Sequence, residues 1–192
     1  MPHSQFQAVL AIAEEYGGLV PAVAARAAGI AANTLVKMAH RGRLERVSRG
    51  VYRVPAYPSS ASQFADYWSA LAWAQSSHGP RQAVISYESA LALYGISDVL
   101  PSRMHITIPE KSRFQRRVIP TRIVVHNADL GADEVNTSRG IPVTTVDRTI
   151  VDVIESGRLD VAAKAIEDAV REGYLSRSSA LRLRKKLRAS YE

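Results

Sequence analysis

The sequence predicts an α+β protein in two parts, a small helical module with a hairpin and a larger α+β domain. Three observations lead to this fold class. Residues 17–55 run as a helix, a glycine turn, a second helix and an arginine-rich hairpin, which is the order of a winged helix-turn-helix. A stretch rich in proline and serine follows at 56–61 and predicts a linker. Beyond it, helical and extended patterns mix without regular βαβ alternation, which predicts a small mixed sheet and C-terminal helices.

The helices of the first domain, predicted over residues 1–55, follow from apolar spacing and from helix-ending residues. An apolar stripe predicts a helix over 4–16. Pro21 suits the first turn of the next helix, because its missing N–H would have no partner there. Gly29 then supplies the left-handed stop that glycine adopts at low cost. These features predict a short second helix that ends at a tight turn.

The third helix and the hairpin complete the winged module. Either Asn33 or Thr34 can cap the third helix, and Gly42 ends it. Its inward side chains are expected to be Leu35, Met38 and Val36. Leu44 and Val47 are expected on the first strand of the hairpin and Val51 and Val54 on the second, with the tip at residues 48–50.

Polar and basic side chains gather on the third helix and the hairpin. Asparagine and arginine read adenine and guanine edges by paired hydrogen bonds, whereas lysine, threonine and hairpin arginines more often hold phosphates. The sequence therefore predicts a double-stranded DNA interface, with the helix at 32–41 in the major groove and the hairpin on phosphates or in the minor groove. Its residues are Asn33, Thr34, Lys37, His40, Arg41, Arg43, Arg46, Arg49 and Arg53.

The alternative for these side chains is the solvated surface of a small helical bundle. The hairpin argues against it, because a generic bundle has no need of a glycine-tipped basic hairpin directly after its third helix. The charge distribution points the same way. Residues 1–55 carry seven lysines and arginines against three acids, whereas the other 137 residues carry 18 against 15.

Composition narrows the cellular setting. The 192 residues have a net charge of +7 and no cysteine, which excludes disulfides, thiolate catalysis and cysteine-based zinc sites. No apolar run approaches the length of a bilayer span, and no long amphipathic basic helix is present for a membrane surface. We expect a soluble cytoplasmic protein with no membrane partner.

The second domain, predicted over residues 62–192, alternates short strands with helices. Its first helix, at 62–77, is rich in aromatic residues, and a basic loop is expected at 110–117. Strands are predicted at 83–86, 103–109, 122–126 and 141–145, and helices at 87–94, 146–155, 160–172 and 178–190.

Catalytic patterns in the second domain are thin. His105 and His126 lie on adjacent predicted strands with Glu88 near in sequence, but they lack the spacing of a metal site. Asp147 and Arg148 open a helix, where the aspartate can act as a cap and the arginine can pair with a nearby carboxylate. We find no nuclease spacing and no phosphate-binding or nucleotide-binding glycine loop, and we predict no catalytic residue, no metal and no cofactor.

The last predicted helix carries a basic run that has three interpretations. The run can be a second DNA contact, a surface for an acidic partner, or a solvated helix end whose cations favour the helix dipole. The last of these is the simplest. The run consists of Arg177, Arg182, Arg184, Lys185, Lys186 and Arg188.

Several motifs in both domains together match the pattern of one protein family. In the first domain the matching residues are Gly29-Ile30, Thr34-Leu35, Met38, Gly42, Leu44, Arg46-Val47 and Gly50-Val51-Tyr52. In the second domain they are residues 86–91, 95–98 and 105–109, then the stretch 140–145 with 147–152, in which Ile150 replaces a leucine. Together these motifs resemble those of the AbiEi family of antitoxins, and the resemblance covers roughly residues 5 to 175.

The resemblance implies a two-domain transcriptional autorepressor and antitoxin. In that family the winged module binds inverted repeats in the promoter of its own operon. The C-terminal domain is needed to neutralise a nucleotidyltransferase-like toxin encoded next to it, with or without a stable complex. Other members are orphan regulators without an evident toxin. Inverted repeats need a dimer or two cooperating monomers, and no coiled-coil seam indicates which oligomeric state this chain has.

Two other classes of function are kept as alternatives. One is a metal-dependent nucleic-acid-processing enzyme centred on Glu88, Asp98, His105 or Asp147. The other is a protein-interaction module whose basic face meets an acidic toxin. DNA cleavage with a divalent metal would favour the first, and an unshifted promoter fragment would favour the second.

Overall fold

The computed structural model describes residues 2–16, 18–55, 57, 64–74, 83–111 and 119–191. The chain divides into two compact units, Met1–Arg81 (unit 1) and Gln82–Glu192 (unit 2). Both units combine helices with a small sheet, which confirms the predicted α+β class. The predicted linker, apart from Tyr57, and most of the predicted basic loop lie outside the described residues. The domain limits at residues 55 and 62 therefore stay predictions.

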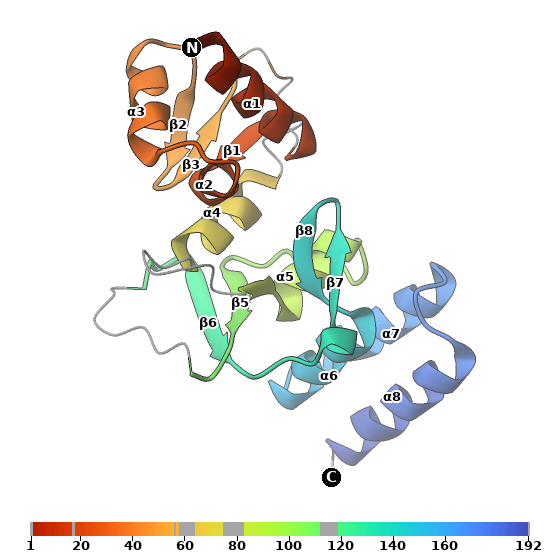
Figure 1. The fold of residues 1–192 in the computed structure, drawn as a ribbon. Helices are drawn as coiled ribbons and strands as arrows, with labels where there is room; N and C mark the ends of the chain where they lie inside the picture. The colour runs from red at the N-terminus through yellow and green to blue at the C-terminus, as the bar shows by residue number, and fades with distance from the viewer. Residues whose placement is uncertain are drawn as a thin grey trace. The chain divides into compact units, whose positions relative to one another are not determined.

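Unit 1 is a winged helix-turn-helix with a fourth helix (Figure 1, red to yellow). Its sheet is antiparallel, in the order β1-β3-β2. The elements are α1 (Pro2–Glu15), β1 (Leu19–Pro21), α2 (Ala22–Ala27), α3 (Ala32–His40), β2 (Glu45–Ser48), β3 (Val51–Arg53) and α4 (Ala65–Ala74).

The turn between α2 and α3 forms where the glycine pattern predicts it. Gly29 has a φ of +78°, and the N–H of Ile30 returns to the carbonyl of Ala25, 2.8 Å away. Ile30 then enters the core, as do Leu35 and Met38 from α3. These contacts fix the angle at which α3 leaves the turn, so that its opposite side faces outward.

Three details of the winged module differ from the sequence prediction. Pro21 ends β1, where it pairs with Val51 on an edge strand that tolerates a missing N–H, and it is the N-cap of α2 and not a residue of its first turn. The cap of α3 is Ala31, with no side-chain hydrogen bond, so neither predicted capping residue caps it. Val36 is 37% exposed and not in the core. Val47 lies on a hairpin strand as predicted, and it is 43% exposed at the point where the β2–β3 register shifts.

Unit 2 is built on a five-stranded mixed sheet in the order β6-β5-β4-β8-β7 (Figure 1, green to blue). The pairs β5–β6 and β4–β8 are parallel, and the other two pairs are antiparallel. The elements are β4 (Val84–Ile85), α5 (Tyr87–Tyr94), β5 (Met104–Ile108), β6 (Ile123–Asn127), the 3-10 turn η2 (Ala132–Glu134), β7 (Val135–Ser138), β8 (Ile141–Thr144), α6 (Val146–Glu155), α7 (Leu159–Arg171) and α8 (Arg177–Ala189).

One hydrophobic cluster of unit 2 comes from the apolar sides of α5 to α8. Ile150 and Ile154 of α6 and Ile166 of α7 are at most 2% exposed, and Leu183 of α8 packs into the same cluster. Each of the last three helices therefore leaves its charged side outside this cluster. That outer side decides which charges of unit 2 are available to a partner.

Candidate nucleic-acid interface

The outward side of α3 presents four neighbouring side chains. Asn33, Val36, Lys37 and His40 are exposed and follow one another at steps of three, one and three residues, which places them on one face of the helix. Leu35 and Met38 lie on the opposite face and are buried. A helix anchored on one side and polar on the other is the arrangement in which a recognition helix presents base-reading groups.

The structure places the nine predicted contact residues on α3, on the turn that follows it and on the β2–β3 hairpin. Arg41 lies at the end of α3 and is exposed, whereas Thr34, in the first turn of α3, is half-buried. Arg43 is exposed, and its guanidinium carbon lies 5.3 Å from the ring centre of Phe6 on α1. That cation–π contact holds Arg43 against the first helix. Sequence spacing gives no indication of it.

The hairpin, or wing, carries Arg46, Arg49 and Arg53. Arg46 is exposed on β2, and Arg49 is exposed in the turn beside Gly50, whose φ is +81°. Arg53 stands opposite Glu45 in the β2–β3 register, and its Nε donates to the carboxylate of Glu45 over 3.1 Å. The charge of Arg53 is therefore compensated within the wing.

Helix α4 supports the wing from within unit 1. The hydroxyl of Ser48 on β2 donates to the hydroxyl of Ser69 on α4 over 3.0 Å, and Ser69 donates to the Ala65 carbonyl. The ring of Trp68 meets the ring of Tyr16 edge to face, with centres 4.5 Å apart. Burial raises the pKa of Tyr16 above its usual value. These contacts connect α4 to both the hairpin and the end of α1.

The predicted histidine pair does form in unit 2. His105 Nδ1 lies 3.1 Å from His126 Nε2, and Tyr87 stacks on His126 with ring centres 3.6 Å apart. The carboxylate of Glu88 lies 3.5 Å from the other nitrogen of His105 and pairs with Arg158.

Burial and the neighbouring His105 lower the pKa of His126 to about 4. Burial also lowers the pKa of His105, against the opposing effect of Glu88. Because His105 turns its two nitrogens to opposite partners, the donor atoms form a chain and do not converge on one point. The described residues contain no group of three or more histidines and carboxylates able to hold a metal ion.

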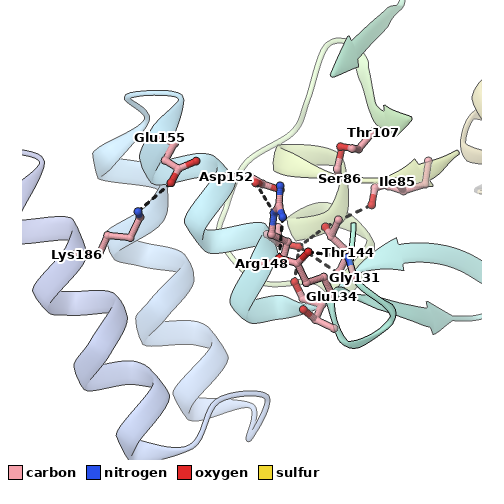
Figure 2. A network of polar contacts seen from close by, with 12 residues as sticks. Ile85, Ser86, Thr107, Gly131, Glu134, Thr144, Arg148, Asp152, Glu155 and Lys186 are labelled. Atoms are coloured by element: carbon pink, nitrogen blue, oxygen red, sulfur yellow. Dashed lines mark hydrogen bonds and ion pairs between the residues drawn. The ribbon is translucent and has the colours of Figure 1, made fainter. Parts of the chain in front are cut away.

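A second polar network ties α6 to the turn before β7 (Figure 2). Arg148 donates to Asp152 through Nε and to Glu134 through a terminal nitrogen, each over 2.7 Å. The N–H of Gly131 donates to the other oxygen of Glu134 over 2.9 Å. The hydrogen bond from Arg148 lowers the pKa of Glu134, whereas burial raises that of Asp152. This network joins separate elements of the fold.

The residues of the enzyme alternative are not gathered in one place. Asp147 does not cap α6, since the cap position is Thr145, and Asp147 pairs instead with Arg182 of α8 over 2.5 Å. Asp98 is 89% exposed and lies 3.9 Å from Lys164 of α7. Of the four residues, only Glu88 and His105 are paired with each other by a described contact.

The basic run of α8 divides between two faces. Arg182 pairs with Asp147, and Lys186 with Glu155, both on α6 (Figure 2 shows the second pair, which is 2.9 Å long). The remaining cations of the run, together with Leu181, are exposed. Part of the run therefore fastens α8 to α6.

None of the helices in the described part of the chain combines the length and the hydropathy that a bilayer-spanning segment needs.

Comparisons with known proteins match both units. A family model described as "Transcriptional regulator, AbiEi antitoxin" matches residues 7–55, and one described as "AbiEi antitoxin C-terminal domain" matches residues 82–187. The chain is also similar to the crystal structure of RV2827C protein from Mycobacterium tuberculosis. The TM-score is 0.40 and the sequence identity 15%, over 99% of this chain and 78% of that one. No curated protein matches the chain.

Proposed function

Because the chain belongs to the AbiEi antitoxin family, we propose that it is a sequence-specific DNA-binding autorepressor and an antitoxin that acts in the cytoplasm. Its DNA target is proposed to be the inverted repeats of its own promoter. The winged module is proposed to span residues 1–55 and the antitoxin domain residues 62–192. The observation that supports DNA binding best is the outward face of α3 beside a basic wing.

In this proposal α3 enters the major groove of double-stranded DNA. The anchored face with Leu35 and Met38 stays on the protein, and Asn33, Lys37 and Arg41 reach the duplex. An asparagine can make paired hydrogen bonds to adenine, and Lys37 supplies a positive charge for phosphate or guanine. Thr34, His40 and Arg43 border the same surface.

The wing then contacts phosphates or the minor groove through Arg46 and Arg49. Both are exposed, and neither has an ion-pair partner among the described residues. Arg53 has its charge compensated by Glu45 and adds less to the contact.

Affinity measured against salt concentration tests the DNA-binding part. Fluorescence anisotropy with duplex DNA from upstream of the gene should show specific binding by the full chain. Lys37→Ala and Arg49→Ala should each weaken binding on all sequences and flatten the plot of log affinity against log salt by about 0.9. Arg122→Ala, an exposed arginine of unit 2, is the matched control and should change neither value.

If Lys37→Ala and Arg49→Ala keep wild-type affinity and salt dependence, α3 and the wing are not the DNA contact. If the wild-type chain binds the upstream duplex no better than random DNA, the autorepressor proposal is wrong.

The antitoxin part is tested separately in cells. We propose that the C-terminal domain counters a nucleotidyltransferase-like toxin encoded next to this gene. Co-expression from an unrelated promoter should restore growth to cells producing that toxin. Lys37→Ala should restore growth equally well, because DNA binding is not needed when the promoter is foreign. Failure of the wild-type chain to restore growth would favour an orphan regulator.

The family is one of regulators, and we propose no catalytic activity for this chain. We also propose no cofactor.

A further inference from the structure

Large apolar side chains are exposed at two places in the described part of unit 1. They are Val36 on α3, which is 37% exposed, and Val47 on β2, which is 43% exposed. Isolated exposed valines are ordinary on protein surfaces, so exposure alone means little. What distinguishes Val36 is its position at the centre of the helix face proposed to enter DNA.

The neighbours of Val36 show where its side chain stands. Asn33 lies one turn before it, Lys37 next to it and His40 one turn after it, and all three are exposed. The buried face of the helix carries Leu35 and Met38. Val36 is therefore the one large apolar side chain exposed on α3, and it stands among hydrogen-bonding side chains on the outward face.

The major groove contains one apolar group among its donors and acceptors, the C5-methyl of thymine. An apolar side chain packed on that methyl favours a T·A pair over the other three pairs without any hydrogen bond. We propose that Val36 is a specificity-determining residue that contacts a thymine methyl in the DNA target. This inference rests on the proposed DNA-binding function.

A contact between two copies of the chain fits this face less well. Such a contact would bring Lys37 and Arg41 of one copy toward the same cations of the other, and neither has an ion-pair partner among the described residues. DNA supplies the opposite charge around an apolar methyl. The surroundings of Val36 therefore favour DNA over a second copy.

The test combines a protein substitution with a base analogue that lacks only the methyl group. Duplexes that the full chain binds specifically are first selected from a randomised pool. Each thymine of the bound site is then replaced in turn by deoxyuridine, and affinities are measured for the wild type and for Val36→Ala. One position should weaken wild-type binding about fourfold, the value expected for one methyl-sized apolar contact. The same replacement should not change the affinity of Val36→Ala for the duplex.

Two control variants fix the assignment. Val47→Ala makes the same truncation at the other exposed valine and should keep the wild-type response to that deoxyuridine. Val36→Thr keeps a β-branched methyl and should also lose affinity on that deoxyuridine duplex as the wild type does. Thermal denaturation should show all three variants folded, because both side chains lie on the surface.

The possible failures are distinct. If no duplex is selected, the proposed DNA-binding function fails, and this inference fails with it. If duplexes are selected but no deoxyuridine position loses its effect in Val36→Ala, the DNA-binding function stands and the role of Val36 is wrong. If Val36→Ala changes the oligomeric state in sedimentation and no deoxyuridine position couples to it, the valine belongs to a contact between copies.

Discussion

The ion pair between Glu45 and Arg53 gives a quantitative prediction about the wing. Arg53 Nε lies 3.1 Å from the carboxylate, and the two side chains are 31% and 50% exposed. An exposed pair of this kind contributes at most about 1 kcal/mol to stability, so Glu45→Gln should leave the hairpin folded. The substitution frees one cation on a surface proposed to face phosphates.

Each added phosphate contact makes the plot of log affinity against log salt steeper by about 0.9. Glu45→Gln should therefore bind more tightly at low salt. Its affinity should fall about 3.5-fold more than that of the wild type between 50 and 200 mM salt. Arg53→Ala should leave the wild-type slope nearly unchanged. The double variant with Glu45→Gln and Arg53→Ala should return the steeper slope of Glu45→Gln to the wild-type value.

Fluorescence anisotropy with a selected duplex measures all four proteins. Glu14→Gln, which removes an exposed carboxylate from α1, is the matched control and should keep the wild-type slope. If Arg53→Ala alone flattens the slope by about 0.9, Arg53 already contacts phosphate in the wild type. The reasoning from the ion pair would then be refuted.

Three further measurements test packing and electrostatics. Leu35→Ala should lower the free energy of unfolding of unit 1 by about 2–5 kcal/mol, because a fully buried side chain leaves a cavity; tryptophan fluorescence from α4 in a denaturant titration reports it. The pKa of His126 is lowered from 6.5 to about 4 in the folded chain, so between these two values the unfolded chain binds a proton that the folded chain does not. The folded state therefore has its full stability at pH 7 and loses part of it as the pH falls from 6.5 toward 4. In His126→Gln the loss of stability between pH 6.5 and pH 4 should be smaller than in the wild type by about 1 kcal/mol, a value that allows for solvent screening. The protection of the β5 and β6 amides against hydrogen exchange measures this difference. Thr149→Val should cost about 1 kcal/mol in thermal unfolding, because the buried hydroxyl of Thr144 loses its partner 2.7 Å away and keeps the more distant Ile85 carbonyl, 3.5 Å away.

Helix positions were the most predictable part of this chain. The observed bounds of α5 and α6 match the predicted 87–94 and 146–155, because strong apolar spacing ends at residues that stop a helix. Gly95, with a φ of +72°, is such a residue. Two strands were missed. β1 has only three residues, and β7 is a polar edge strand, V-N-T-S, without the alternation that marks a half-buried strand.

The candidate interface was predictable as a set of residue types but not as a set of partners. Spacing along α3 is enough to place Lys37 and His40 on one outward face. The assignment of Val36 to the core was wrong, because a nine-residue helix offers little periodicity and valine is apolar wherever it lies. The compensation of Arg53 by Glu45 depends on the register of two strands, which only the folded hairpin fixes.

The distribution of partners separates individual cations of the two basic segments, which composition alone does not. In α8, Arg182 and Lys186 are paired with carboxylates of α6, so part of its charge holds the helix in place. On α3 and the wing, Lys37, Arg46 and Arg49 have no ion-pair partner among the described residues. A cation that already has a carboxylate gains less from a phosphate, because that pair must first be broken. Partners therefore set Arg182 and Lys186 apart from the cations of α3 and the wing. They do not set apart Arg184, Lys185 and Arg188 of α8, which are also exposed without an ion-pair partner among the described residues.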